Sequence, residues 1–269
     1  MQYNTGETDA SLKEEYNPEG SLLRKAQCRM FDMLCYLANV LNTLDVQWHL
    51  SAGTALGAYR HKGFIPWDDD LDVAINEKDI NKVKKYLIEH PHDQYKLQCH
   101  ETDKHFYKHW MVLRDTKSEY IVESAGHKIL KYRGLQIDIF SERTGVIPKL
   151  FNFTMKLSKR NNYRYAGHRK FIPIMIYNFQ KFILHPLFNL LSNLFVNKKD
   201  VTYCYGIEFF DPCPQDAVVP FSNIEFEGRM FPCPNNMDVY LKSKFGDKYM
   251  DLPPKESRFQ HKATYKIWD

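Results

Sequence analysis

The spacing of apolar residues along the chain predicts three amphipathic helices. From Ser21 to about Leu44, apolar side chains recur every three or four positions, and Ser21 is a typical N-cap residue. The same period runs from residue 76 to 90 and from 235 to 245, where Gly246 is placed to end the helix. We expect the first helix to pack on a core through Leu22, Ala26, Met30, Met33, Leu34, Leu37, Leu41 and Leu44.

Shorter apolar runs predict strands. Residues 48–52 form one such run, and Gly53 then allows a tight turn into a small helix from Thr54 to about Arg60. A second run, from residue 71 to 75, follows an acidic cluster, and a third covers residues 135–140. We expect a meander at residues 95–99, 106–113 and 119–122, and further strands at 203–210, 217–220 and 224–231.

The composition is that of a globular protein. With 269 residues and 43% hydrophobic side chains, the chain can bury a sizeable core as one large domain or two small ones. Residues 1–20 are polar and lack the basic and apolar parts of a secretion signal, so we expect a flexible lead-in and a cytoplasmic protein. The six cysteines form no C-x-x-C pair, which argues against a zinc site and favours reduced thiols.

Positive charge is concentrated in one block. Eleven Lys and Arg and no Asp or Glu lie between Arg143 and Lys199; subtracting them from the net charge of +4 leaves −7 for the rest of the chain. The block also holds apolar runs at 171–177 and 182–188, which Pro173 and Pro186 interrupt, so a membrane-spanning helix is not expected. Two interpretations stay open: a helical subdomain packed on the sheet, or an interfacial segment that docks on an anionic membrane. Because long apolar runs interrupt the basic residues, nucleic acid is not an expected partner.

The acidic cluster carries the first chemical signal. Asp68, Asp70 and Asp72 alternate along an extended segment and would share one face, with Asp69 on the other. Three like charges on one face repel each other unless a cation lies among them, and oxygen ligands suit Mg²⁺ or Mn²⁺. Acidic clusters are also common in solvated loops, but here an apolar strand follows directly and a glycine turn precedes.

A single carboxylate stands in the apolar strand at 135–140. Asp138 lies between Ile137 and Ile139, and a carboxylate there is costly unless it is paired or bound to a metal. Beside the Asp70–Asp72 strand it would complete a cradle of three carboxylates; the alternative is an edge strand with Asp138 in water.

The string G-T-A-L-G-A-Y-R-H-K-G-F-I-P-W-D-D-D-L-D, from Gly53 to Asp72, resembles the LicD/fukutin family. Gly-Thr, then D-x-D with apolar flanks, then an isolated apolar-Asp-apolar strand is the pattern of nucleotidyltransferase folds. The resemblance covers roughly residues 25–140 and 218–262, and the block from about 150 to 200 matches no feature of the family. Its C-terminal part includes Phe226-Glu227-Gly228, Phe231-Pro232-Cys233-Pro234, Tyr240-Leu241, Phe245-Gly246-Asp247, Tyr249-Met250 and Leu252-Pro253-Pro254.

The resemblance implies an α+β fold: a nucleotidyltransferase-like mixed sheet flanked by helices. Residues 21–269 would form a single catalytic domain, with 149–199 as a helical, basic and apolar insertion. The implied reaction moves a phospho-linked group, such as phosphocholine or an alditol phosphate, from a CDP-activated donor to a hydroxyl of a cell-surface glycan or its lipid-linked precursor. The alternatives are a nucleotidyltransferase that consumes a nucleoside triphosphate and releases pyrophosphate, and an inactive glycan-binding or scaffold protein.

The resemblance also implies roles for individual residues. Asp70 and Asp72 match the metal-binding D-x-D, and Asp138 matches the third carboxylate, as a ligand of Mg²⁺ or Mn²⁺ or as the general base. The basic side chains at 60–62 would lie close to the phosphates of the donor; the alternative is a solvated basic loop. Arg258 and His261, near the C-terminus, could also contact the donor phosphates; the alternative for them is a solvated basic tail. The residues expected at the donor are Gly53, Thr54, Arg60, His61, Lys62, Asp68, Arg258 and His261.

Overall fold

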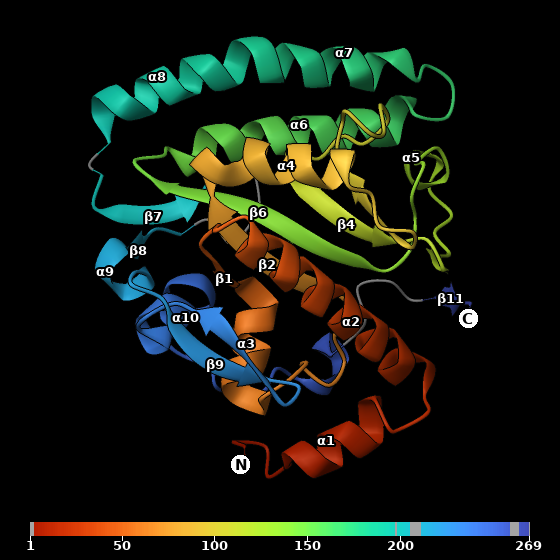
Figure 1. Ribbon diagram of the computed structural model, residues 1–269, viewed down its shortest axis with the longest axis vertical. Coiled ribbons are helices and arrows are strands. Elements are labelled where there is room, and N and C mark those ends of the chain that lie inside the picture. The colour runs from red at the N-terminus through yellow and green to blue at the C-terminus, as the bar shows by residue number, and fades with distance from the viewer. Residues whose placement is uncertain (1–2, 197, 205–210, 259–263, 269) are drawn as a thin grey trace.

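The computed structural model describes residues 3–196, 198–204, 211–258 and 264–268, and its central feature is a mixed β-sheet (Figure 1). Its main strands run in the order β1 (Trp48–Leu50), β2 (Leu71–Asn76), β6 (Gln136–Thr144), β4 (Met111–Asp115) and β3 (Tyr95–Gln98). β7 (Asp200–Tyr203) pairs with β6, and β8 (Cys213–Pro214) pairs with β7. The pairing of β2 with β6 is parallel, whereas β1 on β2, β4 on β6 and β3 on β4 are antiparallel. A mixed sheet with surrounding helices confirms the α+β class.

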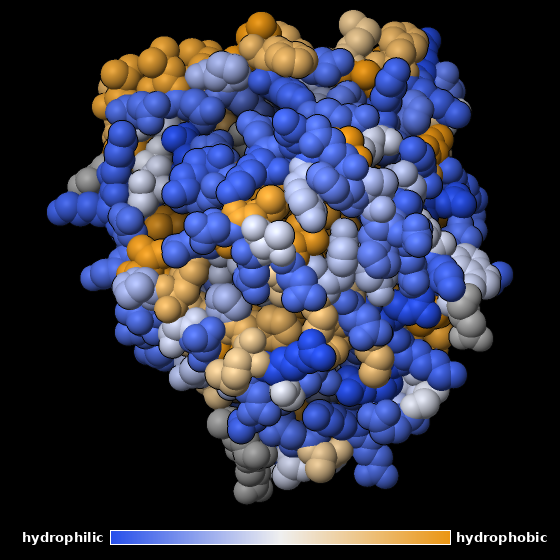
Figure 2. Space-filling model, in the orientation of Figure 1, coloured by the Kyte–Doolittle hydropathy of each residue, from blue (hydrophilic) through white to orange (hydrophobic). Residues whose placement is uncertain are grey.

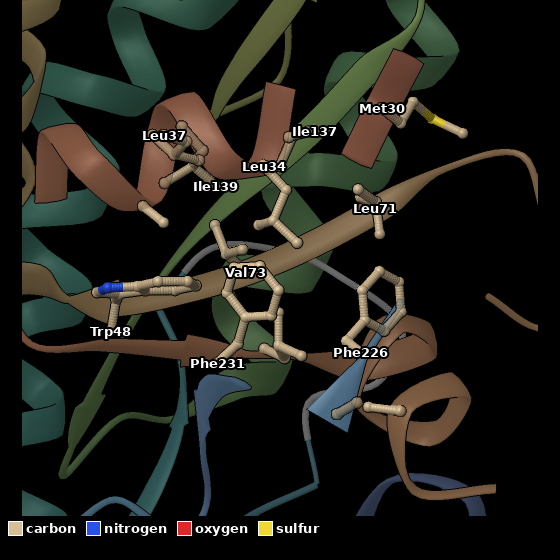
Figure 3. Packing of buried hydrophobic residues seen from close by; sticks show 14 of the residues in the cluster. Met30, Leu34, Leu37, Trp48, Leu71, Val73, Ile137, Ile139, Phe226 and Phe231 are labelled. Atoms are coloured by element: carbon tan, nitrogen blue, oxygen red, sulfur yellow. The ribbon is translucent and has the colours of Figure 1, made fainter. Parts of the chain in front are cut away.

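The main core fills one face of this sheet. Helix α2 (Leu22–Thr43) begins as predicted at Ser21, whose Oγ accepts a hydrogen bond from the Arg24 N–H at 3.2 Å. Its apolar face packs on the strand residues that point toward it, together with the hairpin of β9 (Ser222–Phe226) and β10 (Arg229–Cys233) (Figure 3). The labelled core side chains are Met30, Leu34, Leu37, Trp48, Leu71, Val73, Ile137, Ile139, Phe226 and Phe231.

The opposite face of β2 and β6 carries the carboxylates. Because side chains alternate along a strand, Asp72 and Asp138 point away from the core that holds Val73 and Ile139. On their face, Ala74, Phe140 and Tyr203 form a small second cluster, and Trp110 packs against it.

Two further helices confirm their predicted positions. α3 (Ala52–His61) follows β1 directly, and α10 (Met237–Phe245) begins after the N-cap Asn236 and ends at Gly246, which has a φ of +79°. In place of the single helix expected at 76–90, the chain forms a 3-10 turn, Glu77–Asp79, followed by α4 (Ile80–Glu89).

Several strand predictions are corrected. Residues 217–220 belong in part to a short helix, α9 (Gln215–Val218), which ends just before Pro220, a residue that cannot continue a helix. β5 (Ser118–Tyr120) leaves the expected meander and pairs with β11 (Tyr265–Ile267) from the chain's C-terminal region. Residues 106–110 approach β4 without belonging to it, and of the expected strand at 203–210 only Tyr203 is in a described strand, because 205–210 lie outside the described residues.

The N-terminal lead-in contains a helix. α1 (Asp9–Tyr16) is capped by Thr8, which exchanges hydrogen bonds with Ser11, and its Leu12 is fully buried. Residues 1–20 therefore supply part of the fold, although their polar composition predicted only a flexible segment. Two further short helical segments are α5 (Ala125–Lys128) and a 3-10 turn at Lys255–Ser257.

The basic and apolar block is helical. It comprises α6 (Pro148–Tyr165), α7 (Phe171–Phe179), a π-helical segment (Gln180–Leu184) and α8 (His185–Phe195). The last three run without a break as one long helix at the molecular surface, with α6 beneath it (Figure 1). The π-helical turns precede Pro186, whose missing N–H and ring are incompatible with a regular helix at that point. Among the residues described here, no helix combines the length and apolarity needed to cross a membrane.

Candidate active site

The acidic cluster leads into β2 at its N-terminal end. The strand begins at Leu71, so Asp72 is on the strand and Asp68 to Asp70 form its approach. Two backbone hydrogen bonds fix Asp72 beneath the start of α3: its N–H donates to Thr54 Oγ1 at 2.8 Å, and its carbonyl accepts from the Ser51 N–H at 3.0 Å. The Gly-Thr turn and the D-x-D segment are therefore in direct contact.

Asp72 and Asp138 are register partners in the parallel pairing of β2 with β6. Partners in adjacent parallel strands project from the same face, so their carboxylates emerge side by side. Both are largely shielded from water, at 9% and 6% exposed. This pairing confirms that the strand of Asp138 lies beside the Asp70–Asp72 strand and excludes the edge-strand alternative.

The carboxylates repel one another. Burial raises the pKa of Asp72 well above its usual range, and the charges of Asp70, Asp138 and Asp68 raise it further, while the Gly53 N–H lowers it by hydrogen bonding. The pKa of Asp68 is also raised well above its usual range, by burial and then by Asp70 and Asp69. Negative charge is thus held together at a cost that a cation would remove.

Asp69 has a different environment. It is fully buried, its N–H donates to Asp68 Oδ1 at 3.2 Å, and its carbonyl accepts from the Tyr120 hydroxyl at 2.9 Å. These bonds fix the approach to β2.

Gly53 lies against the carboxylates. A Cβ on Gly53 would be 3.3 Å from Asp68 Oδ2, a tight approach, and 3.7 Å from Asp72 Oδ2, an ordinary contact, so a larger residue there would crowd Asp68. The preceding Ala52 has a φ of +42°, an unusual value for alanine, and its N–H donates to the Tyr240 hydroxyl at 3.3 Å. The start of α3 is therefore fixed both by the acidic cluster and by α10.

A buried group of hydroxyls supports that turn. Ser51 Oγ is hydrogen-bonded to the hydroxyls of Tyr203 and Tyr240, which are 3.0 Å from each other. Burial raises the pKa of both tyrosines, so they stay protonated. Tyr203 and Tyr240 were not predicted as site residues, because their link to Ser51 spans some 150 and 190 positions of the chain.

Asp138 has three nitrogen-bearing neighbours. The Trp110 indole N–H donates to Oδ1 at 2.9 Å, the Gln136 amide donates to Oδ2 at 3.2 Å, and Lys108 Nζ is 3.6 Å from Oδ1. The Lys108 ammonium also lies over the Trp110 ring, 4.7 Å from its centroid. Trp110 and Lys108 are additions to the predicted site; the only sequence signal was the strand expected at 106–113.

Arg60 and His61 correct the expectation of a basic loop. Both are buried in the last turn of α3, where Arg60 Nη1 donates to the Tyr249 carbonyl at 3.0 Å and Nε donates to His61 Nε2 at 2.9 Å. His61 Nδ1 is 2.6 Å from Asp9 Oδ1. Lys62 is the helix C-cap, and its exposed ammonium is 3.2 Å from Glu225. The basic side chains at 60 and 61 thus join α3 to the N- and C-terminal parts of the chain.

Arg258 lies near the acidic segment but is engaged elsewhere. Its guanidinium is 5.2 Å from the centroid of Trp67, the residue before Asp68, and it forms two hydrogen bonds with the Glu7 carboxylate at 2.8 and 2.9 Å. It is 6% exposed. His261 lies outside the described residues.

The donor chemistry of the cluster fits a hard divalent cation. Buried carboxylates with raised pKa values supply only oxygen, the ligand type that Mg²⁺ and Mn²⁺ prefer. Within the described ranges, no group of three or more His, Cys, Asp or Glu side chains already has an arrangement that could hold a metal ion. Metal binding by Asp70, Asp72 and Asp138 therefore stays a prediction.

Comparisons with known proteins agree with the sequence pattern. The family described as LicD/FKTN/FKRP, nucleotidyltransferase domain, matches residues 45–190, so the match extends into the helical block that had no expected counterpart in the family. The lipopolysaccharide cholinephosphotransferase LicD of Haemophilus influenzae is 28% identical over 258 residues, which cover 89% of this chain and 95% of that protein.

Two more relatives are similar over shorter stretches. Human ribitol 5-phosphate transferase FKRP is 34% identical over 80 residues, 30% of this chain and 15% of that protein. An uncharacterized protein of Rickettsia prowazekii is 29% identical over 77 residues, 29% of each chain. Since the family match covers more than half of the 269 residues and contains Asp70, Asp72 and Asp138, the chain belongs to the LicD/FKTN/FKRP family.

Proposed function

We propose that this protein moves a phospho-linked group, of the phosphocholine or alditol-phosphate type, from a CDP-activated donor to a hydroxyl of a cell-surface glycan or its lipid-linked precursor. The relative from H. influenzae is a lipopolysaccharide cholinephosphotransferase, and human FKRP is a ribitol 5-phosphate transferase. The observation that carries the proposal is the side-by-side position of Asp72 and Asp138, with Asp70 two positions before Asp72 in the approach to β2. We propose a cytoplasmic location.

We further infer a nucleotidyltransferase-like fold. β1 leads through the Gly53 turn into α3, the chain returns as β2 with its D-x-D segment, and the third carboxylate stands on the adjacent β6. The family description, with its nucleotidyltransferase domain, supports this inference.

Asp70, Asp72 and Asp138 would hold Mg²⁺ or Mn²⁺. When bound, the ion supplies positive charge against the phosphate oxygens of the donor, on which negative charge develops during transfer. Gly53 and Thr54 hold Asp72 in place, the first through its N–H to the carboxylate and the second through its hydroxyl to the Asp72 N–H. Asp68 adds a further oxygen donor at the edge of the cluster.

Asp138 is our choice for the general base. In the transfer, the acceptor oxygen forms a bond to phosphorus, its proton passes to the Asp138 carboxylate, and the bond from phosphorus to the leaving CMP oxygen breaks. The Trp110 N–H and the Lys108 ammonium orient the carboxylate, and the ammonium is a positive charge 3.6 Å from it.

Product analysis tests this proposal. The purified protein is incubated with Mg²⁺ and a panel of CDP-activated compounds, or with nucleoside triphosphates, and both CMP and pyrophosphate are quantified. Release of CMP from one donor in the presence of a glycan acceptor supports the transferase. Pyrophosphate release from a triphosphate indicates the nucleotidyltransferase alternative, and glycan binding without either product indicates the scaffold alternative.

A further inference from the structure

The long surface helix turns its apolar side outward. We call the exposed side of residues 171–195 the apolar ridge; its members are between 47% and 75% exposed. Figure 2 shows hydrophobic atoms gathered along the top of the molecule, where Figure 1 places α7 and α8. The ridge consists of Phe171, Met175, Phe179, Phe182, Ile183, Leu187, Leu190, Leu194 and Phe195.

The same helix turns polar side chains toward the domain. Gln180 and Ser192 are fully buried, and His185 is 5% exposed. Gln180 Oε1 accepts from Ser158 Oγ at 2.7 Å, and Ser192 Oγ accepts from the Ile147 N–H at 3.1 Å. A surface helix in water has the opposite arrangement, with its apolar stripe against the core. The helix is thus attached to the domain by hydrogen bonds and by ring contacts, of Tyr177 with His100 and His109 and of Phe188 with Phe151, while the ridge faces outward.

Exposed basic residues precede and follow the ridge along the chain and occur on the neighbouring α6. Lys159, Arg160 and Arg164 on α6 are exposed, as are the pair at 169–170 before α7 and the pair at 198–199 after α8. No Asp or Glu lies between Arg143 and Lys199. Lys181, on the helix itself, pairs with Glu101 at 2.9 Å. An apolar strip with basic residues before it, after it and on the neighbouring α6 complements an anionic lipid surface, whose interior accepts apolar side chains and whose headgroups attract Lys and Arg.

We propose that the apolar ridge inserts into the interface of an anionic lipid bilayer, with the helix lying parallel to the membrane plane. At about 1.5 Å per residue, the 25 residues from Phe171 to Phe195 give a contact line of roughly 37 Å. This orientation agrees with the two sides of the helix: polar side chains contact the protein on one side, and the apolar ridge faces outward on the opposite side. This inference does not depend on the proposed reaction.

Docking in this way would place the membrane near the candidate base. A hollow of about 210 Å³ is lined by Lys108 and Trp110, which contact Asp138, and by Tyr177, His185 and Pro186 of the long helix. A lipid-linked acceptor could reach the site from that side. This consequence, unlike the docking itself, rests on the proposed function.

Vesicle sedimentation tests the docking. Vesicles of phosphatidylcholine alone are compared with vesicles that also contain phosphatidylglycerol, at low and high salt. We expect binding to the anionic vesicles and release by salt, because attraction to headgroups falls off within a Debye length. Replacing two ridge residues, Phe182→Glu with Leu194→Glu, should lower the partition coefficient by about a hundredfold or more, since each removes an apolar side chain that the bilayer would bury.

Two control variants make the result specific. Met230→Glu changes a side chain that is 63% exposed on β10, outside the ridge, and should bind vesicles like the wild type. Lys159→Gln with Arg160→Gln should weaken binding to anionic vesicles by about fivefold for each charge removed. Circular dichroism and thermal unfolding of every variant verify the fold.

Three results would overturn the proposal. The first is negligible binding of the wild type to both kinds of vesicle. The second is binding that the ridge variant retains in full. The third is a dimer in analytical ultracentrifugation that the ridge variant abolishes, because the ridge would then be covered by a second copy of the chain.

Discussion

Asp72 on β2 and Asp138 on β6 stand opposite each other as register partners in the parallel part of the sheet. The relationship brings together two residues that are 66 positions apart in the sequence and gives the pair Asp70 and Asp72 a third carboxylate. Because the two strands are hydrogen-bonded along their length, the separation of the two residues is set by the sheet itself. The candidate site therefore rests on a rigid element.

Removing one carboxylate of the D-x-D segment should abolish metal binding and spare the fold. We expect Asp70→Asn and Asp72→Asn each to lose affinity for Mg²⁺ or Mn²⁺ in calorimetric titration. Because each substitution removes a negative charge from a repelling cluster, the metal-free variants should unfold at a higher temperature, by about 2–4 °C for each kcal/mol of repulsion relieved. Asp247→Asn, at an exposed position, is the control; unchanged metal affinity in both cluster variants would contradict the assignment.

Two glycines of α3 should respond differently to alanine. At Gly57 a Cβ would be 2.6 Å from the carbonyl oxygen of Gly63, a backbone atom, so Gly57→Ala should destabilise the protein by about 1–3 kcal/mol. At Gly53 the one tight neighbour is the Asp68 carboxylate, a side-chain group at 3.3 Å that can shift, so Gly53→Ala should keep its stability and, by displacing that carboxylate, lose metal affinity severalfold. Urea denaturation and metal titration of both variants measure this difference, and equal losses of stability would refute it.

The Trp110 indole should matter through its N–H. Trp110→Phe keeps an aromatic ring against Phe140, whose centroid is 5.4 Å away, but removes the hydrogen bond to Asp138. A hydrogen bond to a charged group is worth about 1.5–3 kcal/mol, so turnover should fall roughly ten- to hundredfold. Steady-state CMP release is the measurement, with the exposed Trp268→Phe as a control. A turnover like that of the wild type would show that Trp110 only packs.

His61 should make the fold sensitive to acid. Burial, and then the neighbouring Arg60, lower its pKa from 6.5 to about 4. The unfolded chain therefore binds more protons than the folded one between these values, so stability falls as the pH falls from about 6.5 toward 4. In the folded protein, His61 Nε2 accepts a hydrogen bond from Arg60 Nε, so protonating Nε2 would break that bond.

Comparing unfolding free energies at about pH 7 and about pH 5 tests this. The loss attributable to His61 at pH 5 is roughly 2 kcal/mol. It should disappear in His61→Gln and persist in His90→Gln, which alters an exposed histidine at the end of α4. An unchanged pH dependence in His61→Gln would show that other groups cause it.

Local patterns were enough to predict much of the fold. The helical period located α2 and α10 within two residues at each end, and alternation assigned Val73 and Asp72 to opposite faces of β2. Both signals are local, because the side-chain direction in a helix or strand depends only on position along it. The lone carboxylate in an apolar strand marked Asp138 as needing a partner, but its place beside Asp72 was one of two open interpretations, and the register of β2 with β6 decided between them.

Long-range contacts could not be predicted. Trp110 and Lys108 reach Asp138 only because β4 lies next to β6, a pairing that no local pattern indicates. Arg60 was expected near solvent and phosphate. It is buried instead, and its guanidinium donates to the carbonyl of Tyr249, a residue 189 positions later in the chain. At 217–220 the apolar run had β character, yet the backbone ends a short helix there before Pro220.

The most direct test of the account is a double-mutant cycle between Asp72 and Asp138. Asp72→Asn, Asp138→Asn and the double variant are compared with the wild type in steady-state CMP release over a range of donor and Mg²⁺ concentrations. If the two carboxylates act as one site, each single variant should lose about 10²–10⁴-fold in rate and the double variant little more, because residues that act as a unit are strongly non-additive. A near-wild-type rate for Asp138→Asn, or losses that simply multiply in the double variant, would contradict a shared site.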